Sequence, residues 1–370
     1  MYGKAMRVAL MAVAATLLHS ASVFANTLYV GPASCGPKVT HYATIQAAVN
    51  AAAPADTVMV CPGTYAEQVV IPIPLTVRGF VNGVSGAAVI TVPPTGLVPN
   101  ITMTTAGLVA AQIAAQNTFG VKLIDLTIDG TNEGCATSVG ANYTAAIALS
   151  NLVSSDPSFL SVSLSQLSIQ NQRGGCQLSA GVLSEDSLIS VDSNSIYNVE
   201  LNAVSLVRGM GKITNNTIEN CTTGGVFVSN VTGATVQSNT MSSDAFGVRI
   251  DSSTATNVWS NTMGPWVGEG VYSTASSGTW VNGNRISATW AGVYLDGSQG
   301  DRVTSNTIVR TETYGIADTN SRGGNQLSGN TINGAPIGLF FDASASAAGD
   351  VVTTNTYLNV VTTTSSTPIL

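Results

Sequence analysis

The stretches VQSNTM at residues 236–241 and VWSNTM at 258–263 are nearly identical and lie 22 residues apart. The asparagine of this motif recurs through the second half of the chain at intervals of 22 to 25 residues. A second series, glycine or alanine followed by an apolar residue, runs in step with it, as in GVRI at 247–250 and GVYL at 292–295. Two series with one period indicate stacked repeats. The recurring asparagines are Asn194, Asn216, Asn239, Asn261, Asn284, Asn306, Asn330 and Asn355.

Each repeat contains short β-branched runs separated by Gly, Ser and Asn, without helical periodicity. This pattern predicts an all-β solenoid, a parallel β-helix with coils of about 22 residues stacked about 4.8 Å apart. An asparagine at the same place in every coil can donate its amide to the asparagine of the next coil, which stabilises stacked strands. We therefore predict regular coils with an asparagine ladder over 180–357. Earlier coils carry Leu75, Leu126 and Leu167 at the matching position.

The N-terminal residues resemble an export signal, because Lys4 and Arg7 precede an apolar run at 8–18 and the small-residue site VFA at 23–25. We expect residues 1–25 to be removed and 26–370 to form a single β-helix domain, secreted or retained in the periplasm or cell envelope. No later apolar run is long enough to span a membrane. The open end of a solenoid needs a cover, and YATIQAAVNAAA at 42–53 predicts a capping helix over 44–53 with Thr44 as N-cap.

Composition bounds the partners and the redox state. The formal net charge is −7 at pH 7, and only 9% of residues are charged, so a basic footprint for nucleic acid is missing. Disulfides persist in exported proteins. We predict two, Cys35 with Cys61 and Cys135 with Cys176, the second because each cysteine follows an isoleucine at an equivalent position by seven residues. This pairing leaves Cys221 free, and buried free thiols are the alternative throughout.

A family resemblance agrees with this fold. The stretch TIQAAVNAAAPADTVMVCPGTYAEQVVI at 44–71, followed by LTVRG and by coils of GVxL and NTI type, resembles right-handed parallel β-helix proteins of the pectin-lyase-like class. GTYAE at 63–67 is similar to the N-terminal motif of pectinesterases, but that family's QDTL, DFIFG and GRPW stretches are absent. The NTD and GHG motifs of polygalacturonases are absent too. The resemblance therefore implies a fold and no specific catalytic motif.

In proteins of this class, substrates lie along the outward face of the strands that here begin with GV. Side chains alternate along a strand, so the second and fourth residues after the glycine should point outward. Aromatic residues, 6% of the chain, gather there beside charges on consecutive coils. Rings next to carboxylates suit sugars, so we predict a polysaccharide site along coils 247–315. Its predicted binding residues are Tyr272, Tyr294, Trp266, Trp290, Tyr314 and Glu269.

The same face offers candidate catalytic residues. Asp251 and Asp296 have the same register two coils apart, about 9.6 Å at the backbone, close to the separation of about 6.5–9.5 Å in inverting glycosidases. Arg249 could hold a substrate carboxylate. Two alternatives remain open at this point: each aspartate closes an Asx-turn at a strand end, or the rings stack only on one another.

DGTNEG at 129–134 offers Asp129, Asn132 and Glu133 as oxygen donors for Ca²⁺, against which a disulfide-pinned turn is the alternative. No other cofactor or metal is expected. The first hypothesis is an exported protein that binds a polysaccharide and, if it is an enzyme, degrades it as a glycosidase or a lyase. The second is a non-catalytic envelope or adhesion protein in which the stack serves as a rigid spacer.

Overall fold

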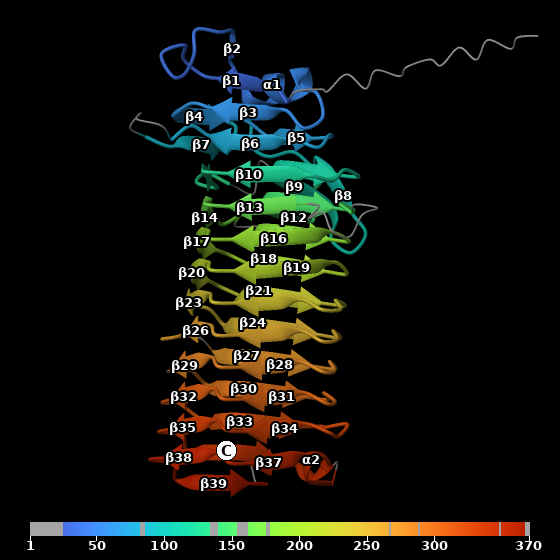
Figure 1. Cartoon of the computed structure of the whole chain (residues 1–370), viewed down its shortest axis with the longest axis vertical. Coiled ribbons are helices and arrows are strands. Elements are labelled where there is room, and N and C mark those ends of the chain that lie inside the picture. The colour runs from blue at the N-terminus through green and yellow to red at the C-terminus, as the bar shows by residue number, and fades with distance from the viewer. Residues whose placement is uncertain are drawn as a thin grey trace, which may run out of the picture.

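The computed structural model describes residues 25–81, 86–133, 140–153, 162–174, 178–265, 268–287, 289–347 and 349–366. The chain folds into a right-handed parallel β-helix in which three parallel sheets run the length of the molecule. Figure 1 shows the coils stacked along the long axis, from the helix α1 (Ile45–Ala51) at one end to β39 (Thr362–Ser365) at the other. The predicted fold class and its N-terminal helix are confirmed.

Each coil contributes one strand to each sheet. The first sheet contains, in spatial order, β2 (His41–Tyr42), β1 (Thr27–Val30), β3 (Thr57–Val60), β6 (Thr76–Gly79), β10 (Val121–Ile124), β13 (Val162–Ser165), β16 (Leu188–Asp192), β19 (Met210–Thr214), β22 (Thr235–Gln237), β25 (Asn257–Trp259), β28 (Trp280–Asn282), β31 (Arg302–Thr304), β34 (Gln326–Ser328) and β37 (Val351–Thr353). The second sheet contains β4 (Gly63–Ala66), β7 (Ala88–Thr91), β11 (Leu126–Asp129), β14 (Ser168–Gln172), β17 (Ser195–Val199), β20 (Thr217–Cys221), β23 (Thr240–Ser242), β26 (Thr262–Met263), β29 (Arg285–Ser287), β32 (Thr307–Val309), β35 (Thr331–Asn333) and β38 (Thr356–Leu358).

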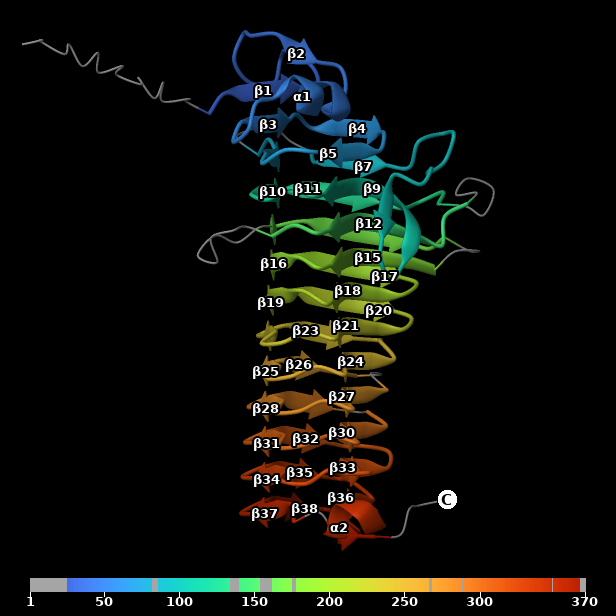
Figure 2. The ribbon, with the colours of Figure 1, turned by 90° about the vertical axis from the view of Figure 1, so that its right-hand side faces the viewer.

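The third sheet carries the strands that begin with the GV motif. It contains β5 (Val69–Ile71), β9 (Gly107–Gln116), β12 (Tyr143–Ser150), β15 (Leu178–Glu185), β18 (Asn202–Val207), β21 (Gly224–Ser229), β24 (Phe246–Asp251), β27 (Glu269–Thr274), β30 (Ala291–Asp296), β33 (Tyr314–Thr319), β36 (Ile337–Phe341) and β39. β8 (Ile101–Met103) pairs antiparallel with β9 and forms a hairpin on the outside of this sheet. A second short helix, α2 (Ala343–Ala347), packs against β33 and β36 near the C-terminal coil (Figure 2).

The recurring asparagines occupy the corner between the first and second sheets. Asn239 donates its backbone N–H (2.9 Å) and its side-chain Nδ2 (3.0 Å) to Oδ1 of Asn261 one coil further on. Asn261 donates in the same way to Asn284, at 2.9 and 3.0 Å. The ladder continues from Asn194 to Asn355. The predicted asparagine ladder is confirmed.

The residue before each ladder asparagine has a left-handed backbone conformation, whether it is Ser, Gly, Asn or Thr. Ser238 has φ 56°, Ser260 has φ 53° and Gly283 has φ 64°. This left-handed conformation turns the chain sharply between two strands, and Gly and Asn adopt it with little strain. The turn brings the asparagine side chain inward, where it finds only other asparagines and backbone carbonyls, such as Val236 O at 2.9 Å from Asn261 Nδ2.

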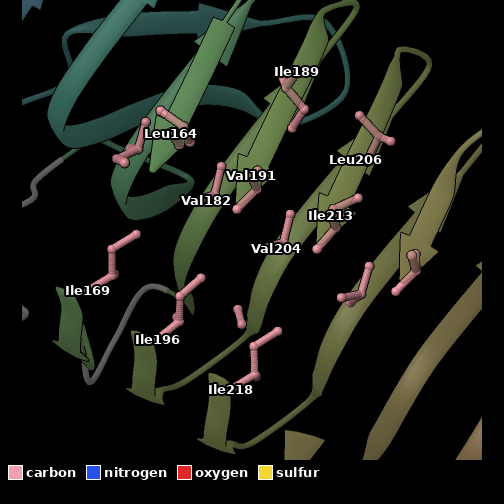
Figure 3. Close-up of a cluster of buried hydrophobic side chains, with 14 of the residues drawn as sticks. Leu164, Ile169, Val182, Ile189, Val191, Ile196, Val204, Leu206, Ile213 and Ile218 are labelled. Atoms are coloured by element: carbon pink, nitrogen blue, oxygen red, sulfur yellow. The ribbon is translucent and has the colours of Figure 1, made fainter. Parts of the chain in front are cut away.

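The interior is a continuous apolar core formed by equivalent residues of successive coils. Ile169, Ile196 and Ile218 are register partners on the second sheet and are fully buried (Figure 3). Val182 and Val204 of the third sheet lie beside them. Burial of one apolar residue per strand face, repeated coil after coil, is the main favourable term in a repeat protein.

The N-terminal end of this core is covered as predicted. α1 begins after Thr44, whose side chain accepts a hydrogen bond from Ala47 N at 3.1 Å, and it buries Ile45, Ala48 and Val49. It ends at Ala51, two residues before the predicted boundary, and Ala52 is already extended. Glu67 holds the helix start by accepting from Ile45 N and Gln46 N.

The cysteine predictions are settled in part. Cys35 and Cys61 form a disulfide, as predicted. Cys221 is free and fully buried in the core, also as predicted. Cys135 and Cys176 lie outside the described residues, so their pairing stays a prediction. Residues 1–24 of the predicted export signal at 1–25 lie outside them too. In the described part of the chain, no helix has the length and apolar character needed to cross a membrane.

Candidate functional site

The outward face of the third sheet carries a straight column of side chains. Phe227, Arg249, Tyr272 and Tyr294 are direct register partners on β21, β24, β27 and β30. All four are half-buried, whereas Val248 between them in sequence faces inward and is fully buried. The predicted alternation along these strands is therefore confirmed. Residues 22 or 23 positions apart become neighbours because the ladder places them one strand spacing apart.

Four rings of this face form a continuous strip, which we call the aromatic strip: Phe246, Tyr272, Tyr294 and Trp290. Ring centroids are 5.8 Å apart for Phe246 and Tyr272, 5.5 Å for Tyr272 and Tyr294, and 6.0 Å for Trp290 and Tyr294. Trp290 is 39% exposed. These distances lie in the range of favourable ring pairs. The rings therefore pack on one another, and Trp290 still presents ring surface to the outside.

Two of the predicted aromatic binding residues are not among these four rings. Tyr314 is only 5% exposed, because its ring stacks on Phe340 at 4.8 Å and meets the edge of Trp290 at 5.7 Å. Its ring therefore packs against Trp290 and Phe340, and its role as a binding residue stays a prediction. Trp266 lies outside the described residues.

Arg249 is the charged centre of the strip. Its guanidinium lies 5.8 Å from the Phe227 ring centroid, 5.5 Å from that of Phe246 and 5.6 Å from that of Tyr272. Its Nη2 also pairs with Asp251 Oδ2 at 2.9 Å. The hydrogen bond to Asp251 is the main cause of the raised pKa of Arg249. The guanidinium is thus held in place by one carboxylate and three rings.

The two candidate catalytic aspartates have different surroundings. Asp251 and Asp296 both pair in register with Thr274, which confirms their predicted spacing of two strands. Asp251 is occupied by Arg249, whereas Asp296 accepts from Tyr272 Oη at 3.3 Å and from Asn320 Nδ2 at 2.8 Å. Neither carboxylate is held by an Asx-turn; both are held by side chains of the outer face. Their catalytic role stays a prediction.

Asp342, which directly follows β36, has a structural role. Its Oδ1 accepts from Ala345 N at 2.8 Å and from Ser344 Oγ at 2.9 Å. Asp342 therefore caps the start of α2, as an acidic N-cap does. The contrast separates a structural aspartate at a strand end from the two aspartates that lie among the rings.

The rings and charges surround one open depression of about 390 Å³. It is lined by Phe246, Arg249, Glu269, Tyr272, Trp290, Tyr294 and Asp296. Glu269 is the first residue of β27, and burial raises the pKa of its carboxyl above the usual value. The depression thus offers ring faces, one cation and two carboxylates, which is the mixture that binds a polar ligand with apolar faces.

The predicted Ca²⁺ donors are engaged with the protein. Asp129 Oδ1 accepts from Thr131 N at 2.9 Å and Thr131 Oγ1 at 2.6 Å, and Ser179 Oγ donates to Glu133 Oε2 at 2.7 Å. Burial raises the pKa of Glu133 to about 7. Asn132 lies at the tip of the same turn with φ 74°. Calcium binding here stays a prediction.

Sequence reasoning missed the contacts that shape the neighbouring part of this face. Glu185, only 1% exposed, accepts from Thr105 N at 2.8 Å and pairs with Arg208. Thr105 belongs to the tip of the β8–β9 hairpin, 80 residues earlier in the chain. No periodic signal links it to Glu185, because the hairpin is an insertion outside the repeat.

Comparisons with known proteins support the fold. Residues 213–368 match the family described as periplasmic copper-binding protein (NosD). The A-module of the mannuronan C-5 epimerase AlgE6 from Azotobacter vinelandii is similar at a TM-score of 0.63 and 16% identity, over 88% of this chain and 95% of that chain. The GH136 lacto-N-biosidase from Eubacterium ramulus is similar at 0.63 and 13%, over 90% and 68%.

A third solved structure, the catalytic unit of a GH87 α-1,3-glucanase from Streptomyces thermodiastaticus, is similar at a TM-score of 0.53 and 14% identity, over 90% of this chain and 68% of that chain. At such identities the likeness shows a shared β-helix fold. No curated protein matches the sequence.

The description of the matched family names copper, so the matched residues should contain copper ligands if this chain binds it. Soft donors such as Cys and Met favour Cu(I), and imidazole favours copper more generally. Residues 213–368 contain no histidine, and the sulfurs of Cys221, Met241 and Met263 belong to fully buried core residues. Among the described residues, no group of three or more His, Cys, Asp or Glu side chains is arranged to hold a metal ion. The described donor set does not fit a copper site.

Proposed function

We propose that this protein binds a polysaccharide along the outward face of the third sheet, over coils 247–315. The observation that carries the proposal is the aromatic strip bordering a depression of about 390 Å³ that also contains Arg249, Glu269 and Asp296. The apolar C–H faces of sugar rings stack on aromatic rings, while carboxylates and a guanidinium take the hydroxyl groups. Exposed apolar patches edged by polar groups usually mark binding sites.

The shape of the site supports a linear ligand. The partners Arg249, Tyr272 and Tyr294 repeat at the strand spacing along a straight line. A polymer laid along the solenoid axis meets one such side chain per coil, so several weak contacts add up. The similar solved structures include proteins described as a mannuronan epimerase and an α-1,3-glucanase, which agrees with a carbohydrate ligand.

Binding is tested by replacing the most exposed ring. Trp290→Ala is expected to lower the affinity for the bound polysaccharide about tenfold, since about 1.4 kcal/mol corresponds to a factor of ten. Affinity electrophoresis over a panel of soluble polysaccharides measures the effect. Trp280→Ala is the matched control, because Trp280 is 36% exposed, similar to the 39% of Trp290, but lies on the first sheet. Equal loss in both variants, or loss in neither, contradicts the proposal.

A second candidate function is hydrolysis of the bound polymer by Asp251 and Asp296. Their common register with Thr274 favours it, because two strand spacings bring the carboxyl groups within reach of the separation in inverting enzymes. In this hypothesis Arg249, which pairs with Asp251, orients that carboxylate and stabilises charge that develops on the substrate.

Cleavage is measured as new reducing ends, with unsaturated products followed separately to detect a lyase. If the protein cleaves, Asp296→Asn and Asp251→Asn are each expected to lower the rate at least 100-fold while the polymer still binds. Asp192→Asn is the control, because Asp192 lies on the first sheet. Binding without product in the wild type indicates a lectin-like role. Absence of both binding and product favours the rigid spacer.

The disulfide and the family match both bear on where the protein acts. The Cys35–Cys61 disulfide and the match of residues 213–368 to a family described as periplasmic agree with a location outside the cytoplasm. We propose secretion or retention in the periplasm or cell envelope, after removal of residues 1–25.

A further inference from the structure

A second hollow lies on the same outward face, on the N-terminal side of the aromatic strip. It has a volume of about 350 Å³, in the range of ligand pockets. All the residues that line it are uncharged. Its apolar lining includes Leu183, Leu201, Val207 and Phe227, and Ser205 also lines it. We call this hollow the apolar groove.

The apolar groove and the depression beside the aromatic strip are parts of one track. Leu183, Ser205 and Phe227 are register partners on β15, β18 and β21, and Phe227 is in turn the register partner of Arg249. Phe227 lines the groove on one side, and its ring centroid lies 5.8 Å from the Arg249 guanidinium on the other. A linear polymer that covers the aromatic strip therefore continues into the groove.

One wall of the groove is formed by a hairpin that is not part of the repeat. The tip of the β8–β9 hairpin, Thr105 and Ala106, lines the groove. Thr105 N donates to Glu185 at 2.8 Å, and Arg208 pairs with the same carboxylate. Ala106 is 8% exposed and packs in a cluster with Leu183. The β8–β9 hairpin thus forms one side of the groove, and the contacts of Thr105 and Ala106 hold it in place.

On the basis of the proposed function, we propose that the apolar groove is a specificity subsite for an acylated sugar unit, such as one with an N-acetyl or O-acetyl group. The bound chain meets two charged carboxylates and a guanidinium in the depression, but only apolar side chains, hydroxyls and amides in the groove. An unsubstituted, strongly hydrated sugar gains little binding free energy from contact with such apolar walls. An acyl methyl group gains their apolar contact, and its carbonyl can accept from a rim amide such as that of Asn202.

The test compares ligands with the same backbone and different substitution. Chitohexaose and cellohexaose differ in their N-acetyl groups, and acetylated xylan is paired with its alkali-deacetylated form. Wild-type protein is expected to bind the acetylated member of each pair that it recognises about fourfold more tightly for each methyl group buried, which corresponds to ~0.8 kcal/mol. Calorimetry or affinity electrophoresis measures the ratio.

Two substitutions assign the preference to the groove. Val207→Thr changes little volume but places a hydroxyl in the apolar lining, and Leu183→Asn places an amide there. Each is expected to reduce the preference for acetylated ligand toward one, chiefly because the acetylated member binds more weakly. Thermal unfolding verifies that both variants fold, and Val207→Thr alone suffices if Leu183→Asn does not.

The outcomes separate this inference from the proposal beneath it. Equal wild-type affinity for acetylated and bare ligands overturns the acyl subsite and leaves polysaccharide binding standing. A preference that survives in Val207→Thr and Leu183→Asn overturns its assignment to the groove. Failure to bind any member of the panel overturns both proposals.

Discussion

Asn261→Leu is expected to lower the free energy of unfolding by roughly 2–6 kcal/mol. A buried N–H group left without a partner costs about 1–3 kcal/mol, and this change leaves two N–H groups of Asn239 without one. Asn239 donates both its backbone N–H and its Nδ2 to Asn261 Oδ1, at 2.9 and 3.0 Å. Val236 O also loses the hydrogen bond from Asn261 Nδ2. Urea or thermal denaturation, monitored by circular dichroism, measures the loss.

Position in the ladder provides a sharp control. Asn194 is the first asparagine, and the residue before it in the stack is Leu167, which donates only its backbone N–H to Asn194 Oδ1 at 2.9 Å. Asn194→Leu therefore orphans one donor and extends the apolar part of the column by one coil. We expect about half the loss seen for Asn261→Leu. Equal losses at the two positions would contradict the view that amide pairing between coils, and not side-chain size, sets the effect.

Stability is expected to fall as the pH rises from about 4 to about 7. Burial raises the pKa of Asp244 and of Asp318 to about 7 and that of Asp301 to about 6. In the native protein these carboxyls keep their protons well above pH 4, whereas in the unfolded chain they release them near pH 4. Their contribution is complete below the unfolded pKa and is lost as the pH passes the folded pKa.

The size of the effect is large because several carboxyls act in the same direction. One pKa unit corresponds to about 1.4 kcal/mol, so a shift from 3.8 to about 7 at Asp244 is on the order of 4 kcal/mol. Asp244→Asn is expected to flatten the curve of unfolding free energy against pH between 4 and 7. The asparagine can still accept from Cys221 N, as Asp244 does at 2.7 Å.

An aspartate whose pKa is lowered in the native protein supplies the control. Hydrogen bonding, first of all from Thr214, lowers the pKa of Asp192. Its contribution to stability is present above its unfolded pKa and is lost only as the pH falls below about 4. Asp192→Asn should therefore change the acid limb and leave the slope between pH 4 and 7 intact. A wild-type stability that rises across this range would show that the buried carboxyls are ionised in the native protein.

The period of the sequence determined most of the fold. A recurrence of 22 to 25 residues with short β-branched runs has one physical solution, because each coil can bury its apolar face only against the next coil. The same period places Tyr272 beside Tyr294 and aligns Asp251 with Asp296, which are pairwise facts of register. Register along a parallel ladder carries over from coil to coil, so it can be counted in the sequence.

Only the tertiary structure decided what each outward side chain does. Tyr314 is buried by Phe340, and Asp251 is occupied by Arg249, since packing and ion pairing depend on neighbours that periodicity does not specify. The apolar groove depends on Thr105, which reaches Glu185 across 80 residues from an insertion without a repeat. The repeat determines which residues stack, because equivalent residues of successive coils are neighbours in the sheets. The contacts made by insertions, and the rotamers of the outward side chains, are set only once the chain has folded.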